Sequence, residues 1–158
     1  MRDLIRRTAV AAGAATLVLG ASAGAAAASA AAPTSHLYWA NQNAGTIVEA
    51  NLNGTSAHVI ASSQAQPLGV AVDASHLYWA NRGAGTIVEA GLDGTGAQVI
   101  ASGQSGPWGV AVDASHLYWS NANFTGGDTI VEAALGGTGQ QVIASGQDTP
   151  TGVAVGPQ

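Results

Sequence analysis

Three histidines recur once every forty residues and are the first candidates for metal chemistry in this sequence. His36, His76 and His116 each stand immediately before the string Leu-Tyr-Trp. Imidazole nitrogens bind zinc at about 2.0–2.1 Å, so three recurring histidines suggest a zinc site. If the repeats form neighbouring sheets, however, equivalent atoms lie at least about 10 Å apart, and one ion cannot reach all three. We therefore expect each histidine to lie in a turn with a local hydrogen bond, and we predict no metal or other cofactor.

Carboxylates recur in the same way and could serve acid–base catalysis. Glu49, Glu89 and Glu132 occupy one position of a Thr-Ile-Val-Glu-Ala string, and Asp73 and Asp113 end a Gly-Val-Ala-Val-Asp string. A glycosidase needs two carboxyl groups about 5–9.5 Å apart in different roles. Copies of one repeat do not readily form such an asymmetric pair, so we interpret the glutamates as solvated strand positions and the aspartates as turn caps. The sequence has no Ser-His-Asp order, P-loop, HExxH motif or EF-hand loop, and we predict no catalytic residue.

Tryptophan occurs both in register with the repeat and once outside it. Trp39, Trp79 and Trp119 could form a ring of sugar-stacking aromatics, but a side chain that buries some 150–250 Å² favours packing between neighbouring repeats. Trp108 has no counterpart, because the other copies carry leucine and threonine at its position. It stands where a loop is expected to lead into a strand, and a non-repeated aromatic residue on a loop is a candidate for ligand contact. We therefore predict Trp108 as the ligand-binding residue.

The elements that must position these side chains are written three times. The copies cover 36–75, 76–115 and 116–158, and the third has three extra residues in the Asn121–Asp128 stretch. Each copy contains four short runs that are typical of strands: HLYWA, TIVEA, VIAS and GVAV. Asn-Gly and Asp-Gly pairs between the second and third runs predict hairpin turns. No linker separates the copies, so we expect them to stack on a shared core.

Four short strands in a period of about forty residues are typical of a β-propeller blade. The alternative, a stack of flat β-solenoid coils, usually has a shorter period. The sequence therefore predicts an all-β fold with one four-stranded blade per repeat.

The repeat also resembles the YWTD repeat of low-density lipoprotein receptor class B propellers. The strings that carry the resemblance are LYW-A-N, TIVEA, LDGT and P-x-GVAVD, in that order. The Thr-Asp of the family pattern is replaced, and Asn41, Asn81 and Asn121 stand at the acidic position, to which the resemblance assigns a structural, blade-linking role. Family propellers have six blades, so three repeats correspond to half of a six-bladed ring.

The strand order implied by the resemblance leaves incomplete blades at both ends of the chain. The P-x-GVAV strand is the innermost strand of a blade, so residues 67–104 and 107–147 should form two complete blades. Residues 36–62 then lack an inner strand, and the strand at 153–156 lacks the rest of its blade. We expect a homodimer, or another propeller-repeat protein, to complete the ring, and deletion of 150–158 should abolish the dimer.

Composition limits the classes of partner. The 158-residue chain has 8% charged residues, no cysteine and four lysine or arginine residues in all. Three of these cations, Arg2, Arg6 and Arg7, lie in the first seven residues, which leaves only Arg82 beyond them. A nucleic-acid-binding protein needs cations to neutralise phosphates, so this class is excluded. The absence of cysteine excludes disulfides and thiol chemistry.

The first thirty residues have the order of a secretory signal peptide: a basic start, an apolar run and a small-residue stretch that ends in Ala28-Ser29-Ala30. The apolar run is shorter than the ~20 residues of a membrane span. We predict cleavage of 1–30, no membrane span in the mature chain, and export from a bacterial cell. The weak continuation after Arg6-Arg7 favours the general secretory route over twin-arginine export.

These observations predict that residues 31–158 form a secreted β-propeller module for binding or scaffolding, with an unknown ligand. Two alternatives stay open: a hydrolase or lyase propeller with a site in the central channel, and a fragment of a longer propeller without a function of its own. An enzyme of that kind should show a non-repeated cluster of acidic or histidine residues at the channel mouth.

Overall fold

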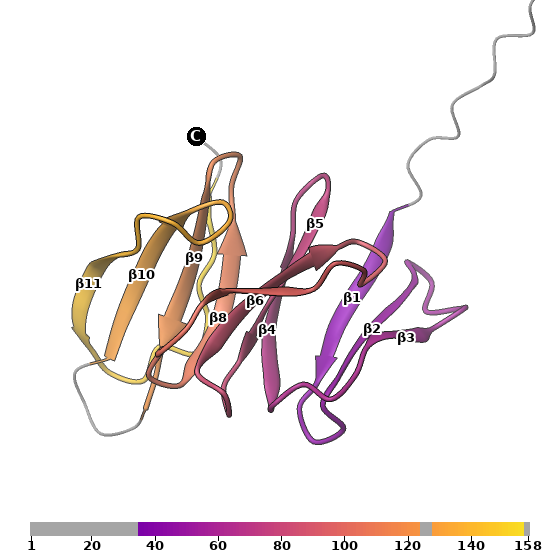
Figure 1. Cartoon of the computed structure of the whole chain (residues 1–158), viewed down its shortest axis with the longest axis horizontal. Helices are drawn as coiled ribbons and strands as arrows, with labels where there is room; N and C mark the ends of the chain where they lie inside the picture. The colour runs from indigo at the N-terminus through magenta and orange to yellow at the C-terminus, as the bar shows by residue number, and fades with distance from the viewer. Residues whose placement is uncertain (1–34, 124–127, 157–158) are drawn as a thin grey trace, which may run out of the picture. The chain divides into compact units, whose positions relative to one another are not determined.

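The computed structural model describes residues 35–123 and 128–156, which form three antiparallel sheets (Figure 1). The predicted leader, 1–30, lies outside the described residues. The part of the chain that is described contains no helix with the length and apolarity of a membrane span. Each sheet is a propeller blade, named here in chain order. Blade 1 contains β1 (His36–Asn41), β2 (Thr46–Asn51) and β3 (His58–Ala61); blade 2 contains β4 (Pro67–Val72), β5 (His76–Asn81), β6 (Thr86–Gly91) and β7 (Gln98–Ala101); blade 3 contains β8 (Pro107–Val112), β9 (His116–Asn121), β10 (Asp128–Ala134) and β11 (Gln141–Gln147).

The order of strands confirms the fold class predicted from the sequence. The four strands of blade 2 run β4-β5-β6-β7, and those of blade 3 run in the same order from β8 to β11. Each complete blade therefore begins with the Pro-x-Gly-Val-Ala-Val strand and continues into the next sequence repeat. Within residues 35–123 and 128–156, blade 1 has no strand before β1, and residues 151–156 form no strand. The blades are thus offset from the sequence repeats by one strand.

The turn between the last two strands of each blade depends on glycine. Gly54 and Gly94 have φ values of 79° and 81°, a left-handed conformation that glycine adopts without steric cost. The preceding Asn53 and Asp93 each accept a hydrogen bond from the backbone amide of the threonine two residues on, at 3.0 Å. The predicted Asn-Gly and Asp-Gly turns are therefore present, with glycine providing the unusual φ and Asn or Asp bracing the turn.

The hydrophobic core lies between blades, because alternate residues of one strand point to opposite faces of its sheet. In β5, Leu77 and Trp79 belong to a cluster shared with Ile47 of blade 1, whereas Tyr78 belongs to a cluster shared with Trp119 of blade 3. All five side chains are completely buried. Each blade therefore needs a neighbour on both faces to bury its apolar residues.

Glycine allows the first strands of neighbouring blades to approach closely. A Cβ atom on Gly69 in β4 would lie 2.4 Å from the carbonyl oxygen of Trp108 in β8. A Cβ atom on Gly109 in β8 would lie 2.9 Å from the Cα atom of Gly152, which follows β11. The segment after β11 thus returns alongside β8 (Figure 1), in the place where the first strand of a further blade would lie. We call β4 and β8 inner strands, and we extend the name inner strand to residues 150–155, which lie in the equivalent place although they form no strand in this chain.

Candidate functional site

The side chains that break the repeat most clearly, Arg82 and Trp108, lie against each other. Arg82 directly follows β5 of blade 2, and Trp108 is the second residue of β8 in blade 3. The guanidinium carbon of Arg82 lies 5.4 Å from the centroid of a Trp108 ring, which is a cation–π distance. Both side chains are half-buried. The backbone amide of Arg82 donates to the carbonyl oxygen of Gln66 at 3.1 Å, which fixes the start of the Arg82 side chain.

Trp108 lies within β8 and not in the loop where the sequence analysis expected it. Its neighbour Pro107 pairs with Asn121, so β8 begins two residues earlier than the Gly-Val-Ala-Val run suggests. Trp108 lies in a register shift between the paired residues Pro107 and Val110, so it is part of β8 rather than of a loop before the strand. Sequence analysis did not single out Arg82 as a site residue, although it was recognised as the one cation beyond the first seven residues.

A buried aspartate at the start of β10 joins Asn123, after β9, to Thr149, after β11, at the same end of the blades. Asp128 is 3% exposed, and its counterparts in the other copies are glycines. Its carboxylate accepts a hydrogen bond from the backbone amide of Asn123 at 3.1 Å and another from that of Thr149 at 3.2 Å. The Asn123 side chain donates to Ser105 Oγ at 2.8 Å. The signal in the sequence is a lone carboxylate in place of a repeated glycine, which the repeat pattern alone does not mark as buried.

The opposite end of the blades carries the repeated aspartates, and both are occupied by hydrogen bonds. Asp73 Oδ1 accepts the backbone amides of Ser75 and His76, each at 2.7 Å, and Oδ2 accepts the Tyr78 hydroxyl at 2.9 Å. Asp113 makes the equivalent bonds in blade 3. Burial alone would raise the pKa of Asp73, but the hydrogen bonds outweigh it and the pKa lies below its usual value. A carboxyl group held ionised in this way braces a loop and is unsuited to act as a general acid.

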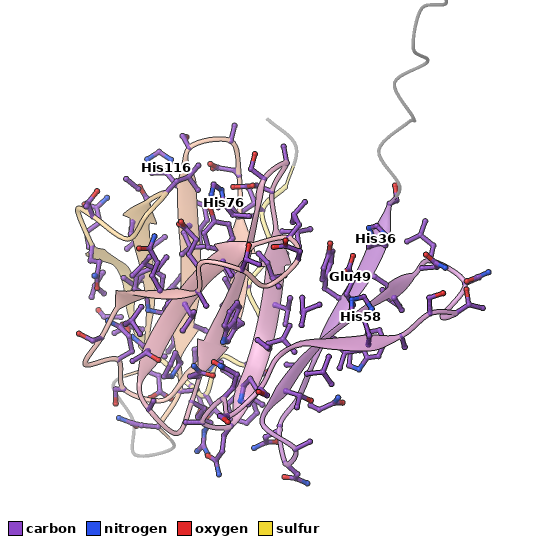
Figure 2. All side chains as sticks on the ribbon, turned by 45° about the vertical axis from the view of Figure 1, so that its right-hand side comes forward. His36, Glu49, His58, His76 and His116 are labelled. Carbon is purple, nitrogen blue, oxygen red and sulfur yellow. The ribbon has the colours of Figure 1, made fainter. Side chains whose placement is uncertain are left out.

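The histidines begin strands rather than lying in turns, and each faces a glutamate. In blade 1, Glu49 lies between two of them: His36 Nδ1 is 3.3 Å from Oε1 and His58 Nε2 is 3.5 Å from Oε2 (Figure 2). His76 and His116 lie on blades 2 and 3, with Nε2 atoms 3.9 and 3.6 Å from the glutamate of the same blade. The glutamates are therefore not simply solvated. Among residues 35–123 and 128–156, no three His, Cys, Asp or Glu side chains form a group that could hold a metal ion.

The hydroxyl of Tyr38 has a different hydrogen-bond acceptor from that of the equivalent tyrosines in the other two blades. In blades 2 and 3 the equivalent tyrosine donates to the aspartate that follows the inner strand. The described part of blade 1 contains no inner strand, and the Tyr38 hydroxyl instead donates to Glu49 Oε1 at 3.5 Å. Burial raises the pKa of Tyr38, and the negative charge of Glu49 raises it further.

The repeated tryptophans and asparagines join one blade to the next through a glutamine. Gln64 lies between β3 and β4, and its Oε1 atom accepts Trp79 Nε1 at 2.8 Å and Asn81 Nδ2 at 2.9 Å. Gln104 makes the same two bonds to Trp119 and Asn121, at 2.7 and 3.2 Å. Trp39 and Asn41 have no such glutamine in the described chain. Asn41 Nδ2 donates to Thr46 Oγ1 at 3.2 Å instead.

We expect replacement of Asp73 by alanine to lower the free energy of unfolding at pH 7 by about 1–3 kcal/mol, because two amides and one hydroxyl lose a charged acceptor. The pKa of this carboxyl group is lower in the folded than in the unfolded chain. Its contribution is therefore complete above the unfolded pKa of about 3.9 and is lost as the pH falls through the folded pKa. The difference between wild type and Asp73→Ala should shrink below about pH 4. Urea denaturation of both proteins from pH 3 to pH 7, at one protein concentration, measures this difference in the free energy of unfolding.

Asp93→Asn is a matched control for this measurement, because Asn53 occupies the equivalent position and makes the same turn bonds. We expect its stability at pH 7 to be close to that of wild type, because the asparagine oxygen can accept the same turn hydrogen bonds. A gap between wild type and Asp73→Ala that does not narrow in acid would contradict the role given to the Asp73 carboxylate.

The strand order, the inter-blade core and the close inner strands define a β-propeller with blades of YWTD type, as the sequence resemblance predicted. No family model and no curated protein matched the chain in sequence comparisons.

Comparison with solved structures confirms the fold. A structure described as a nidogen/laminin complex is similar over 76% of this chain and 48% of that chain, with 25% sequence identity and a TM-score of 0.71. A gluconolactonase from Xanthomonas campestris is similar over 71% of this chain and 44% of that chain, with 18% identity and a TM-score of 0.61. The chain thus spans about half the length of the solved chains that it matches.

Proposed function

We propose that this chain is an exported propeller module that binds a protein partner through the surface around Arg82 and Trp108. The observation that carries the proposal is the contact between two non-repeated side chains on an otherwise repetitive scaffold. The guanidinium carbon of Arg82 lies 5.4 Å from the centroid of the Trp108 ring. Tryptophan and arginine are the residue types most enriched among those that dominate binding energy at protein interfaces. The predicted leader, 1–30, supports a role outside the cytoplasm.

The chemistry of this surface favours a partner segment with a carboxylate beside an apolar side chain. Arg82 is the only lysine or arginine beyond the first seven residues of the sequence. Its guanidinium group can donate to a carboxylate in two parallel hydrogen bonds. The half-buried indole of Trp108 offers apolar area next to that charge. The similar nidogen structure is itself described as a complex with laminin, which agrees with protein binding by a fold of this kind.

Selection of peptides from a random phage-displayed library tests the proposal. Peptides that bind the immobilised wild-type chain should contain a carboxylate, and their affinity should fall on the order of tenfold or more for Trp108→Leu and for Arg82→Gln. Both replacements are residues that the chain already uses at the equivalent positions, Leu68 and Gln42, so the fold should be retained.

Val99→Thr on the outer strand β7 is the control, because Val99 is 58% exposed and belongs to another part of blade 2. It should leave peptide affinity unchanged. Peptides that bind wild type and both site variants equally well would place recognition elsewhere on the molecule.

A lactonase-type enzyme is the competing proposal, and it rests on similarity of fold alone. Hydrolysis of gluconolactone by the purified chain, with and without added divalent cations, distinguishes the two. We expect no turnover above the uncatalysed rate, and turnover that depends on a divalent cation would favour the enzyme.

A further inference from the structure

The blades of this chain are joined by three kinds of contact, and the first two occur at both junctions. The first is the glutamine that accepts hydrogen bonds from Trp and Asn of the next blade. The second is a glycine turn seated on the outer strand of the preceding blade, where a Cβ atom on Gly94 would lie 2.2 Å from the carbonyl oxygen of Ile60. The third is the glycine-mediated approach of neighbouring inner strands, as at Gly69 and Gly109.

Blade 3 presents one half of a further junction. Gln147, the last residue of β11, is the sequence equivalent of Gln64, which follows β3. It is exposed, and its side-chain amide donates to the carbonyl oxygen of Ser145. Ile143 in β11 is 49% exposed, whereas its counterparts Ile60 and Ile100 are partly covered by the next blade. A Cβ atom on Gly152 would meet no atom within 4 Å.

Blade 1 presents the other half. Leu37 is 46% exposed, whereas the equivalent Leu77 is completely buried. Trp39 is half-buried and Asn41 is exposed. A Cβ atom on Gly54 would meet no atom within 4 Å, in contrast to Gly94 of blade 2. Among the residues that the structure describes, no inner strand pairs with β1.

We propose that a second copy of this chain completes the ring, with inner strand 150–155 of each copy pairing with β1 of the other. Two copies form six blades around a two-fold axis, and both open edges are paired in the process. Blade 1 of the second copy then meets blade 3 of the first through the junction that the chain already uses twice, so the interface continues an established one. The similar nidogen chain is about twice as long as the part matched here, which agrees with closure by two copies. This inference does not rest on the proposed ligand site.

The register of the new strand pair follows from the complete blades. Val72 in β4 lies opposite Leu77 in β5, and Val112 in β8 lies opposite Leu117 in β9. By equivalence, Val155 of one copy lies opposite Leu37 of the other. Gln147 then accepts hydrogen bonds from Trp39 Nε1 and Asn41 Nδ2 of the second copy.

Glycine variants separate dimer formation from folding. By equivalence with Gly69, a Cβ atom on Gly152 would clash with the backbone around residue 69 of the second copy, although it touches nothing within its own chain. Gly152→Ala should therefore raise the dimer dissociation constant on the order of tenfold or more. Gly156→Ala is the matched control, because the complete blades carry an aspartate side chain at the equivalent positions 73 and 113. It should dimerise like wild type.

Sedimentation velocity of the purified chain over a range of concentrations measures this difference. Wild type and Gly156→Ala should sediment with twice the mass of one chain, and Gly152→Ala should dissociate at a higher concentration. A stable monomer at every concentration, a closed assembly of another size, or Gly152→Ala that dimerises as tightly as wild type would each overturn the proposal. So would a chain that pairs only with a different propeller-repeat protein.

Disulfide trapping tests the register, and the absence of cysteine from the chain removes background thiols. When Leu37→Cys and Val155→Cys chains are mixed and oxidised, they should form a cross-linked pair, because the side chains of directly opposed strand residues lie on one face. Leu37→Cys mixed with Ala154→Cys should not cross-link, since neighbouring residues of a strand point to opposite faces. Equal cross-linking in both mixtures, or none in either, would overturn the proposed strand pairing.

Discussion

Replacing Trp79 by alanine is expected to remove about 3–5 kcal/mol of stability, the range measured for deletion of a large buried aromatic side chain. Trp79 is completely buried in the core between blades 1 and 2. An indole buries some 150–250 Å², which at about 25 cal/mol per Å² corresponds to roughly 4–6 kcal/mol. The substitution also removes the donor that Gln64 Oε1 accepts at 2.8 Å. Native domains have about 5–15 kcal/mol in total, so Trp79→Ala should remove a large part of the stability of the fold.

Trp39→Ala is the matched comparison, because Trp39 pairs with Val48 just as Trp79 pairs with Val88. Trp39 is half-buried and lies on the open side of blade 1. At protein concentrations where the chain is monomeric, Trp39→Ala should cost clearly less than Trp79→Ala. Guanidinium denaturation followed by circular dichroism measures both variants. Equal losses in the monomer would show that the two tryptophans have equivalent surroundings, contrary to the structure.

Local sequence was sufficient to predict the strands and their number in each repeat. The strings HLYWAN and TIVEA pair in one register in every blade, since the turn between them has fixed length in the first two copies and the insertion in the third lies outside the paired residues. The offset of the blades from the sequence repeats required the order known from the YWTD family, because no property of a single strand says which blade it joins.

The residues that link blades were harder to predict. Gln64 and Gln104 lie in short Ser-, Ala- and Gly-rich segments that resemble loops, and polar loop residues are usually solvated. Their recurrence fifteen residues before Trp79 and Trp119 was the available signal. The histidines were expected in turns because they stand at strand ends, but pairing of His76 with Gly91 brings the first residue into the sheet. Arg82 could not be paired with Trp108 from sequence, since their contact joins two blades.

Alanine substitution in the glycine turns should also have a large effect on stability, and Gly54 serves as the control for Gly94. Gly94 and Gly54 occupy the same turn position with φ values of 81° and 79°, so alanine at either site brings the same backbone strain of about 1–2 kcal/mol. At Gly94 the new Cβ atom would also lie 2.2 Å from the carbonyl oxygen of Ile60, whereas at Gly54 it would meet nothing in its own chain. Because backbone atoms cannot move aside as a flexible side chain can, blades 1 and 2 must separate, at a further cost of about 1–3 kcal/mol.

We therefore expect Gly94→Ala to lower the free energy of unfolding by about 2–5 kcal/mol and Gly54→Ala by about 1–2 kcal/mol, when both are measured by denaturation of the monomer. The difference between the two variants isolates the contact between neighbouring blades, because the strain in the turn is common to both. Ring closure by a second copy would seat Gly54 on Ile143 of that copy, so Gly54→Ala should weaken the dimer even though its monomer is the more stable of the two. Equal effects of Gly94→Ala and Gly54→Ala on the monomer would contradict a close contact between the Gly94 turn and Ile60 of blade 1. The blades would then be joined mainly through Gln64 and Trp79.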